Sequence, residues 1–227
     1  MEHATLRVAP NSTYKIYDAL FGLEEEIITP ENSFIAWNGE TYPFEAWNAD
    51  QTLQSAMNSS VNWYFESVDE QLGAANISNY IQEIGYGNEN ISGDFSTYWM
   101  ESSLKISPIE QVELLTQLQN NNFGFAPENI NAVKDSICLS SSDAGTFYGK
   151  TGTGRVDGQD VYKRQLKISI ERCLNNSHIR QGIFYFFRQL FALCQINNLC
   201  FFIIKAVCKQ QDFKCRTVCI GIYPAFD

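Results

Sequence analysis

The amino-acid composition of this chain changes abruptly near residue 160. Residues 1–159 hold 22 acidic and 6 basic side chains and all four tryptophans. Residues 160–227 hold 4 acidic and 10 basic side chains and six of the seven cysteines. A charge asymmetry of this size separates segments of different origin or role. The break therefore limits the coherent domain to residues 1–159 and sets the remaining segment apart.

The junction reads GQDVYKRQLK. Its residues 160–165 are the peptide that the codons GAT GTG TAT AAG AGA CAG would encode, a string that resembles the transposase recognition end ligated onto DNA fragments for sequencing libraries. We therefore predict that residues 160–227 are an unrelated, Cys-rich, basic tail and not the natural continuation of the chain. The alternative is a genuine Cys-rich second domain. No Cys-x-x-Cys pair with zinc-site spacing occurs in the tail, and a disulfide framework stays open.

Charge and hydropathy exclude several classes of partner. The net charge of −10 disfavours nucleic acid, because binding to phosphates relies on clustered lysine and arginine. The first ten residues lack the charged start, apolar core and cleavage site of a signal peptide. The apolar run at residues 182–208 is interrupted by polar and charged side chains and is not expected to span a membrane.

Helical periodicity runs through residues 10–159. Two apolar stripes repeat at helical spacing and predict buried helix faces ending at Gly85; they are Val61, Tyr64, Phe65, Val68 and Leu72, then Ile77, Tyr80, Ile81 and Ile84. Ser107, Pro108 and Glu110 form a capping-box pattern that predicts the start of another helix. Phe147 and Tyr148 indicate a strand leading towards Lys150. These elements predict a mainly helical region followed by the start of a sheet.

Ser12 and Lys15 form a Ser-x-x-Lys pattern at the start of an apolar helical repeat. Residues three apart lie on the same helix face, so the hydroxyl and the amine should be neighbours. A serine is a poor nucleophile unless a base takes its proton, and a lysine can act as that base only if its pKa falls, through burial or nearby positive charge. The first turn of a helix also favours the negative charge that develops during acyl transfer. The pair is therefore a candidate nucleophile and base, although such a match alone is weak.

Three further motifs follow in order. They are Ser60-Val61-Asn62, Tyr86-Gly87-Asn88 and Lys150-Thr151-Gly152-Thr153. The ordered set, with Ser12 and Lys15, resembles the penicillin-recognising serine proteins over about residues 7–159. Tyr-Gly-Asn, and a Trp99 that matches the tryptophan near the modified lysine, indicate the class D branch of that family.

The resemblance implies a role for each residue of the predicted site. Ser12 is acylated by the β-lactam carbonyl, Lys15 takes its proton as a free or carbon dioxide-modified amine, and Ser60 relays protons to the ring nitrogen. Lys150 with Thr151 binds the substrate carboxylate, and the backbone amides of Ser12 and Thr153 hold the oxyanion. The substrate-binding set is Asn62, Trp99, Lys150, Thr151, Gly152 and Thr153. No metal is expected, and no cofactor except a carbon dioxide adduct on Lys15.

Asn62 favours one branch of the family over the other. Class D hydrolases usually have an apolar residue at this position, in a dry pocket where the lysine carbamate persists. An amide here can hydrogen-bond the amine and stabilise it without the carbamate, so deacylation loses its base. The sequence therefore favours an extracellular sensor domain of the BlaR/MecR type that stays acylated by penicillins. The alternatives are a class D β-lactamase and, in another class, a helical interaction domain without catalysis.

The resemblance also implies a fold and a location. The family fold is α+β, with an antiparallel sheet beside a helical region. Only eleven residues precede Ser12, and family-like sequence ends soon after Lys150, so we expect a truncated serine β-lactamase or penicillin-binding fold with most of its sheet missing. A sensor or secreted hydrolase would work at or outside the outer face of the bacterial membrane. Its membrane segments or targeting signal would lie outside this chain, and its partners would be β-lactam antibiotics.

Overall fold

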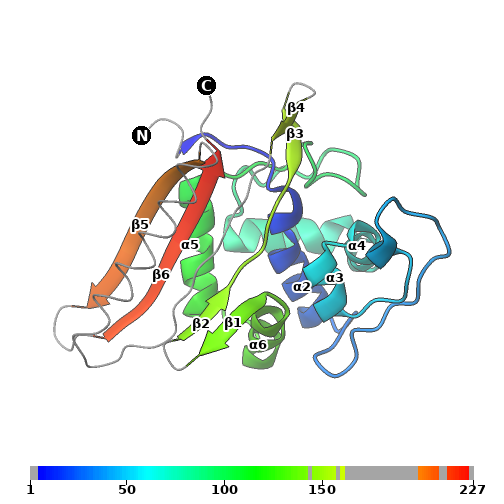
Figure 1. Ribbon diagram of the computed structural model, residues 1–227, viewed down its shortest axis with the longest axis horizontal. Helices are drawn as coiled ribbons and strands as arrows, with labels where there is room; N and C mark the ends of the chain where they lie inside the picture. The colour runs from blue at the N-terminus through cyan, green and yellow to red at the C-terminus, as the bar shows by residue number, and fades with distance from the viewer. Residues whose placement is uncertain (1–4, 143–144, 157–158, 162–198, 210–213, 225–227) are drawn as a thin grey trace. The chain divides into compact units, whose positions relative to one another are not determined.

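The computed structural model describes residues 5–142, 145–156, 159–161, 199–209 and 214–224 (Figure 1). Within it the chain divides into two compact units. The first unit is Met1–Cys138 and the second is Leu139–Asp227. This division precedes the Lys150 motif. It does not address where the natural sequence ends, so a junction at residue 160 stays a prediction.

The first unit is helical. Its elements are η1 (Asn11–Thr13), α2 (Lys15–Glu24), η2 (Glu45–Trp47), α3 (Leu53–Ser59), α4 (Asn62–Ile84), α5 (Pro108–Gln119) and α6 (Pro127–Ser136). Helix α2 contacts α4 and α6, and α3 contacts the same two helices (Figure 1). A long segment joins α2 to α3 and carries the short turn η2. The unit is thus a helical bundle arranged around α2.

Local sequence signals set the helix ends where they were predicted. The Ser107 side chain accepts a hydrogen bond from the Glu110 backbone amide, and the Glu110 side chain accepts one from the Ser107 amide. This capping box supplies acceptors for amides that have no partner within the helix. At the C-terminal end of α4, Gly85 adopts a left-handed conformation with φ 67°, which favours glycine. Both predicted helix boundaries are confirmed.

The two predicted apolar stripes lie on one element. Helix α4 runs across both, with a local break at Gly73, where φ is 75° and ψ is 152°. All members of the first stripe are buried, and the second is buried except for the half-buried Tyr80. Because only glycine adopts this conformation without strain, the chain changes direction inside α4 while both stripes stay in the core.

Helix α2 is buried on every side. Every residue from Lys15 to Leu23 is buried, whereas the apolar repeat alone predicts one buried face. The close approach of α4 depends on Gly22, where an added Cβ would lie 2.5 Å from Val68 Cγ1. The bundle therefore encloses α2, and its polar residues Lys15 and Asp18 lie inside the core.

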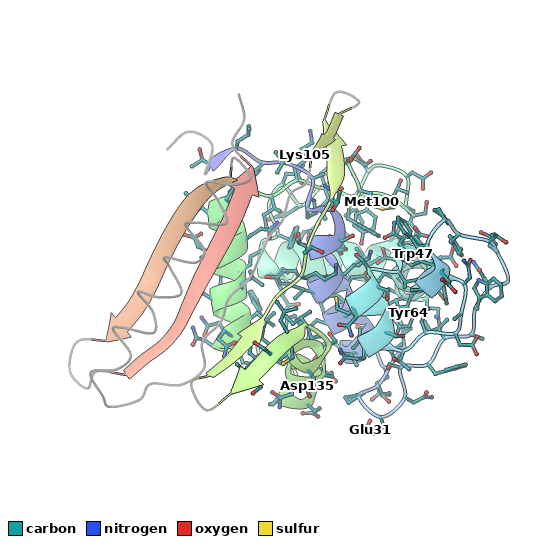
Figure 2. All side chains as sticks on the ribbon, in the orientation of Figure 1. Glu31, Trp47, Tyr64, Met100, Lys105 and Asp135 are labelled. Atoms are coloured by element: carbon teal, nitrogen blue, oxygen red, sulfur yellow. The ribbon has the colours of Figure 1, made fainter. Side chains whose placement is uncertain are left out.

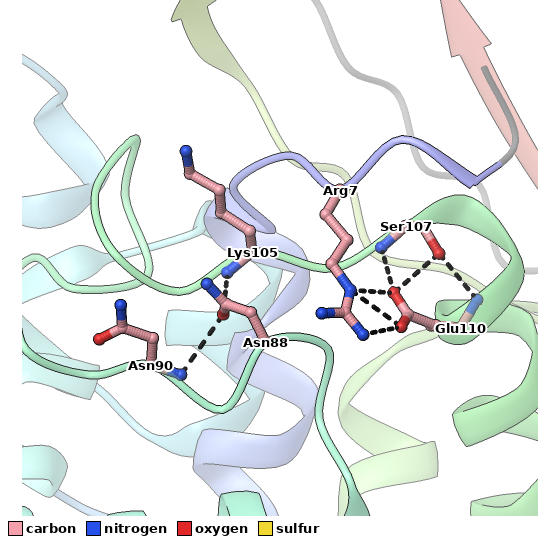
Figure 3. Close-up of polar contacts among 6 residues, drawn as sticks. All are labelled: Arg7, Asn88, Asn90, Lys105, Ser107 and Glu110. Carbon is pink, nitrogen blue, oxygen red and sulfur yellow. Dashed lines mark hydrogen bonds and ion pairs between the residues drawn. The ribbon is translucent and has the colours of Figure 1, made fainter. Parts of the chain in front are cut away.

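The segment before η1 is fastened to α5. Val8 forms a β-bridge with Ile106, and Arg7 Nε donates to Glu110 Oε1 at 3.0 Å (Figure 3). Burial alone would raise the pKa of Glu110, but hydrogen bonds from Arg7 and Ser107 lower it. The same acidic side chain thus caps α5 and holds the approach to Ser12.

The segment between α2 and α3 is tied to the bundle through two indoles. Trp47 Nε1 donates to the Ser59 carbonyl at 3.0 Å, and Trp63 Nε1 donates to the Trp47 carbonyl at 2.8 Å. Tyr64 OH, from the residue after Trp63, donates to the Ser33 carbonyl at 2.7 Å. Trp47 and Tyr64 are labelled in Figure 2. These contacts fix a segment with little secondary structure against the ends of α3 and α4.

Strands form only small ladders in the described residues. They are β1 (Cys138–Ser142) with β2 (Gly145–Tyr148), β3 (Gly154–Val156) with β4 (Gln159–Val161), and β5 (Leu199–Lys209) with β6 (Lys214–Pro224). The prediction of a helical part with little sheet is confirmed. None of the described helices is both long and apolar enough to cross a bilayer. Most of the predicted tail, including Cys173 and Cys194, lies outside the described residues.

Candidate active site

Ser12 lies in the short 3-10 turn η1, immediately before α2. The sequence places it in the first helical turn, whereas α2 itself begins at Lys15 with Tyr14 as its N-cap. Asn11 has φ 49°, and its backbone amide donates to the Trp99 carbonyl at 3.0 Å. The turn that presents Ser12 is therefore held from outside the helix, and the serine itself is half-buried.

Lys15 is fully buried, and four oxygens surround its amine. The Nζ atom lies 3.2 Å from Ser12 Oγ, 2.9 Å from the Ser60 carbonyl and 3.3 Å from Ser60 Oγ. Asn62 Oδ1 accepts from it at 2.5 Å. We call these four residues the lysine cluster. An ammonium has only three N–H groups, so the four oxygens cannot each accept a separate hydrogen bond from this amine.

Ser60 occupies a constrained backbone position. It is the C-cap of α3, with φ 55° and ψ 41°, and Val61 is the N-cap of the following helix. Ser60 therefore ends one helix, and the next helix is capped by its neighbour. A residue other than glycine in this region costs conformational energy, and such positions are concentrated at functional sites. The conformation places both the carbonyl and the hydroxyl of Ser60 beside Lys15.

Aromatic rings and a thioether complete the surroundings of the amine. Lys15 Nζ lies 4.9 Å from the centre of a Trp99 ring and 5.4 Å from that of Phe65. Asn62 Nδ2 donates to Met100 Sδ at 3.1 Å, which leaves its Oδ1 directed at Lys15. A cation close to ring faces is attracted by their π electrons. The site thus combines a half-buried hydroxyl with an amine enclosed by rings and oxygens.

The Tyr86-Gly87-Asn88 motif shapes the chain beside this site. Asn88 Oδ1 accepts from the Lys105 amide at 2.8 Å (Figure 3). Asn88 Nδ2 donates to the Ser103 carbonyl at 2.8 Å. Gly87 has φ 54°, and an added Cβ would lie 2.0 Å from the Lys105 carbonyl oxygen. The motif therefore joins the two ends of the loop that carries Trp99.

The Lys150 motif belongs to the second unit and follows β2. Lys150 is buried, its Nζ donates to the Thr151 carbonyl at 3.0 Å, and burial lowers its pKa to about 8. Thr151 and Thr153 are exposed and Gly152 is buried. The structure therefore brings together Ser12, Lys15, Ser60, Asn62 and Trp99. The roles of Lys150, Thr151, Gly152 and Thr153 stay predictions.

Sequence reasoning missed two buried carboxyl groups. Asp18 is 0% exposed and Asp69 1% exposed, on α2 and α4. The signal was available: Asp18 is the one acidic residue in an otherwise apolar run from Ile16 to Leu23. Acidic side chains are rarely fully buried without a partner.

Residues 2–171 match the penicillin binding protein transpeptidase domain. The chain belongs to that family. Among curated relatives of this transpeptidase domain, the regulatory protein BlaR1 of Bacillus licheniformis is 46% identical over 158 residues, covering 70% of this chain and 26% of the relative. The methicillin resistance mecR1 protein of Staphylococcus aureus is 44% identical over 155 residues, with 68% and 26% covered. The β-lactamase OXA-10 of Pseudomonas aeruginosa is 32% identical over 152 residues, with 67% and 57% covered. The chain therefore spans about a quarter of the length of the BlaR1 and mecR1 relatives.

Solved structures of the transpeptidase family agree with the fold. The C-terminal domain of the Bacillus licheniformis BlaR penicillin-receptor matches with a TM-score of 0.72 and 42% identity, over 76% of this chain and 69% of that one. The class D β-lactamase BAT-2 matches with a TM-score of 0.65 and 38% identity, over 67% and 64%. The chain thus has a serine β-lactamase or transpeptidase fold, described here mainly through its helical part.

Proposed function

We propose that residues 7–159 bind β-lactam antibiotics covalently through Ser12, as the sensor domain of a signal transducer of the BlaR/MecR type. Relatives named as regulatory proteins and a structure named as a penicillin-receptor support this proposal. In this proposal the domain works on the extracellular face of the bacterial membrane, and the ligand is a penicillin or cephalosporin.

The lysine cluster accounts for acylation. Ser12 Oγ attacks the β-lactam carbonyl carbon while its proton passes to the Lys15 amine, 3.2 Å away. The bond between that carbon and the ring nitrogen then breaks, and the nitrogen takes a proton by way of the Ser60 hydroxyl. Lys15 needs no partner from solvent for this step, because it is buried against both hydroxyls. The family resemblance adds the Thr153 amide as an oxyanion donor and Lys150 as the group that binds the carboxylate.

One observation favours a sensor over a hydrolase: the hydrogen bond from Lys15 Nζ to Asn62 Oδ1 at 2.5 Å. Deacylation needs a base that activates water against the ester carbonyl. In class D hydrolases that base is the carbamate of this lysine. A short bond to an amide oxygen stabilises the unmodified amine, and Met100 holds the amide in the orientation that makes this bond. Acylation can therefore proceed while deacylation lacks its base.

A pre-steady-state assay with a chromogenic cephalosporin tests the proposal. We expect a burst of β-lactam ring opening equal to one equivalent of protein, followed by almost no turnover. Mass spectrometry should show the matching adduct on the peptide that contains Ser12. Absence of both burst and adduct would show that the chain is not acylated by β-lactams.

A class D β-lactamase is the second candidate, supported by the similarity to OXA-10 and BAT-2. In that case Lys15 reacts with carbon dioxide to form the carbamate base. Rapid multiple turnover in the same assay, increased by added bicarbonate, would select this candidate and reject the sensor.

We also propose that residues 160–227 do not continue the natural protein. The composition break and the resemblance of residues 160–165 to a library end support this, whereas the family match runs on to residue 171 and does not mark the junction. The missing part of the sheet would then follow the Lys150 motif in the natural chain. Sequencing of an independent clone across codons 155–170 tests the proposal, and the same codons in that clone would make the tail natural.

A further inference from the structure

Asp18 and Asp69 form a buried carboxyl pair. Asp18 lies on α2, three residues after Lys15, and Asp69 lies on α4. Three of their four carboxyl oxygens, both of Asp18 and Oδ2 of Asp69, are buried and accept no hydrogen bond from any donor in the described part of the chain. The fourth, Asp69 Oδ1, lies 3.2 Å from Tyr98 OH. Two ionised carboxylates with a single donor between them would be very costly in a buried site.

A proton between the two carboxyl groups resolves this shortage. A protonated carboxyl becomes a donor, and its neighbour then has an O–H to accept from. Burial raises the pKa of Asp18 well above its usual range. Burial also raises the pKa of Asp69 to about 7, although interactions with Tyr98, Asp18 and Trp99 act to lower it. Both shifts agree with a pair that retains one proton at neutral pH, as close carboxyl pairs do.

The titratable groups around the pair also allow one proton to be retained. Lys15 on α2 lowers the pKa of Asp18, whereas Glu66 on α4 raises the pKa of both carboxyls. The remaining neighbours are phenols that stay protonated, since burial raises the pKa of Tyr14 and Tyr98 well above the usual value. Lys15 is therefore the single cation acting on the pair among these neighbours, and it is already shared with the oxygens of the lysine cluster.

The pair reaches the active site through Trp99. Asp69 Oδ1 accepts from Tyr98 OH, on the residue that precedes Trp99. The Trp99 indole N–H is buried, forms no hydrogen bond in the described residues, and helps to lower the pKa of Asp69. The same indole lies 4.9 Å from Lys15 Nζ, and the Trp99 carbonyl accepts from the Asn11 amide next to Ser12. Asp69 thus acts on the residue that covers Lys15 and supports the turn carrying the nucleophile.

We propose that Asp18 and Asp69 share one proton in the folded domain, and that Asp69 is the positioning residue that holds the Trp99 indole over Lys15. Neither carboxyl touches the ligand. The positioning role rests on the proposed acylation of Ser12, whereas the shared proton does not.

The shared proton is tested by infrared difference spectroscopy on the 227-residue chain at pH 7. We expect the carbonyl band of a protonated carboxylic acid, which disappears in both Asp18→Asn and Asp69→Asn. In each variant an amide N–H replaces the shared proton, so the remaining aspartate stays ionised. A wild-type spectrum without such a band, or a band unchanged in both variants, would overturn the shared proton.

The positioning role is tested by the acylation rate with a fluorescent penicillin. Asp69→Leu removes the acceptor for Tyr98 OH and the carboxyl group that acts on the indole. We expect acylation to slow by about tenfold, since small displacements of reacting groups have effects of this size. Asp69→Asn keeps an acceptor oxygen and should restore the rate to within about twofold of wild type. Val133→Ala, in the buried part of α6, is the control for a general loss of stability and should leave the rate unchanged.

The outcomes separate the two proposals. Equal rates in Asp69→Leu and wild type would reject positioning, as would equal slowing in Asp69→Leu and Val133→Ala. No labelling of the wild-type chain would reject the proposed function and with it the positioning role, whereas the infrared band would still decide the shared proton.

Discussion

Helix α2 contributes to two buried polar clusters in which hydrogen-bond acceptors outnumber donors, one around an amine and one around a pair of carboxyl groups. In the lysine cluster one amine is surrounded by four oxygen acceptors within 3.3 Å. In the carboxyl pair, three oxygens accept from no described donor. In the lysine cluster the surrounding acceptors hold the Lys15 amine beside the hydroxyls of Ser12 and Ser60. A shortage of donors around carboxyls keeps a proton in place, so the same helix provides a reactive site and a support for it.

The largest expected effect is the loss of penicillin labelling when the Ser12 hydroxyl is removed. Ser12→Ala should abolish covalent labelling by a fluorescent penicillin, because it removes the proposed nucleophile, and the proposed role of Ser60, the other hydroxyl of the cluster, is proton transfer. Labelling is measured by gel fluorescence at saturating ligand. Ser107→Ala, which removes another buried serine that caps α5, is the control and should still be labelled. Labelling that persists in Ser12→Ala would move the nucleophile elsewhere.

Asn62→Val removes one acceptor from the lysine cluster and tests whether the Asn62 amide prevents deacylation. Without Oδ1 the amine loses a hydrogen bond, and we expect the steady-state rate of cephalosporin hydrolysis to rise by about tenfold or more. The physical reason is a drier pocket in which Lys15 can carry a carbamate base. Asn58→Ala on the exposed face of α3 is the control. An unchanged rate in Asn62→Val would mean that this amide is not what prevents deacylation.

The carboxyl pair predicts an unusual pH dependence of stability. Burial raises the pKa of Asp69 to about 7, so the folded chain keeps a proton that the unfolded chain releases near pH 4. The free energy of unfolding should therefore fall as pH rises from about 4 to about 7, with a contribution on the order of 1.4 kcal/mol per pH unit. Urea denaturation at several pH values measures this slope. Asp69→Asn should flatten it, and an identical slope in that variant would rule out the pair as its source.

Gly22→Ala tests the packing on which both clusters depend. The new methyl would lie 2.5 Å from Val68 Cγ1 and push α4 away from α2, so we expect the free energy of unfolding to fall by about 1–3 kcal/mol. Thermal unfolding measures the change. The double variant Gly22→Ala, Val68→Ala removes the clashing methyl and should be less destabilised than the sum of the two single variants. Additive effects would mean that the clash is relieved by other movements.

Arg7→Ala should have the smallest effect. The Arg7–Glu110 ion pair lies at the surface, with side-chain exposures of 46% and 27%, so its loss should cost less than about 1 kcal/mol. Lys105→Ala is a matched control, because only the backbone of Lys105 takes part in the network of Figure 3. Both variants should keep wild-type acylation. A large loss of acylation in Arg7→Ala alone would show that the segment before η1 positions Ser12.

Features with a short range in the sequence were predictable from it. The capping box of Ser107 and Glu110, the end of α4 at Gly85 and the spacing of Ser12 and Lys15 all depend on residues within one helical turn. Hydrogen bonds and steric limits of the backbone act over that range, so a local pattern is sufficient to specify them. The order of the motifs also indicated the family before any distance was known.

The tertiary structure decided what those residues meet. Lys15 and Asn62 lie 47 positions apart, and their contact exists because α2 packs against the start of α4. The sequence predicted one buried face for α2, but the bundle encloses it on every side and so buries Asp18 against Asp69. Periodicity shows which residues avoid water, yet it does not show how many neighbours a helix will have. Burial of a charged group, and the proton or partner it then needs, follows only from the packing of the whole bundle.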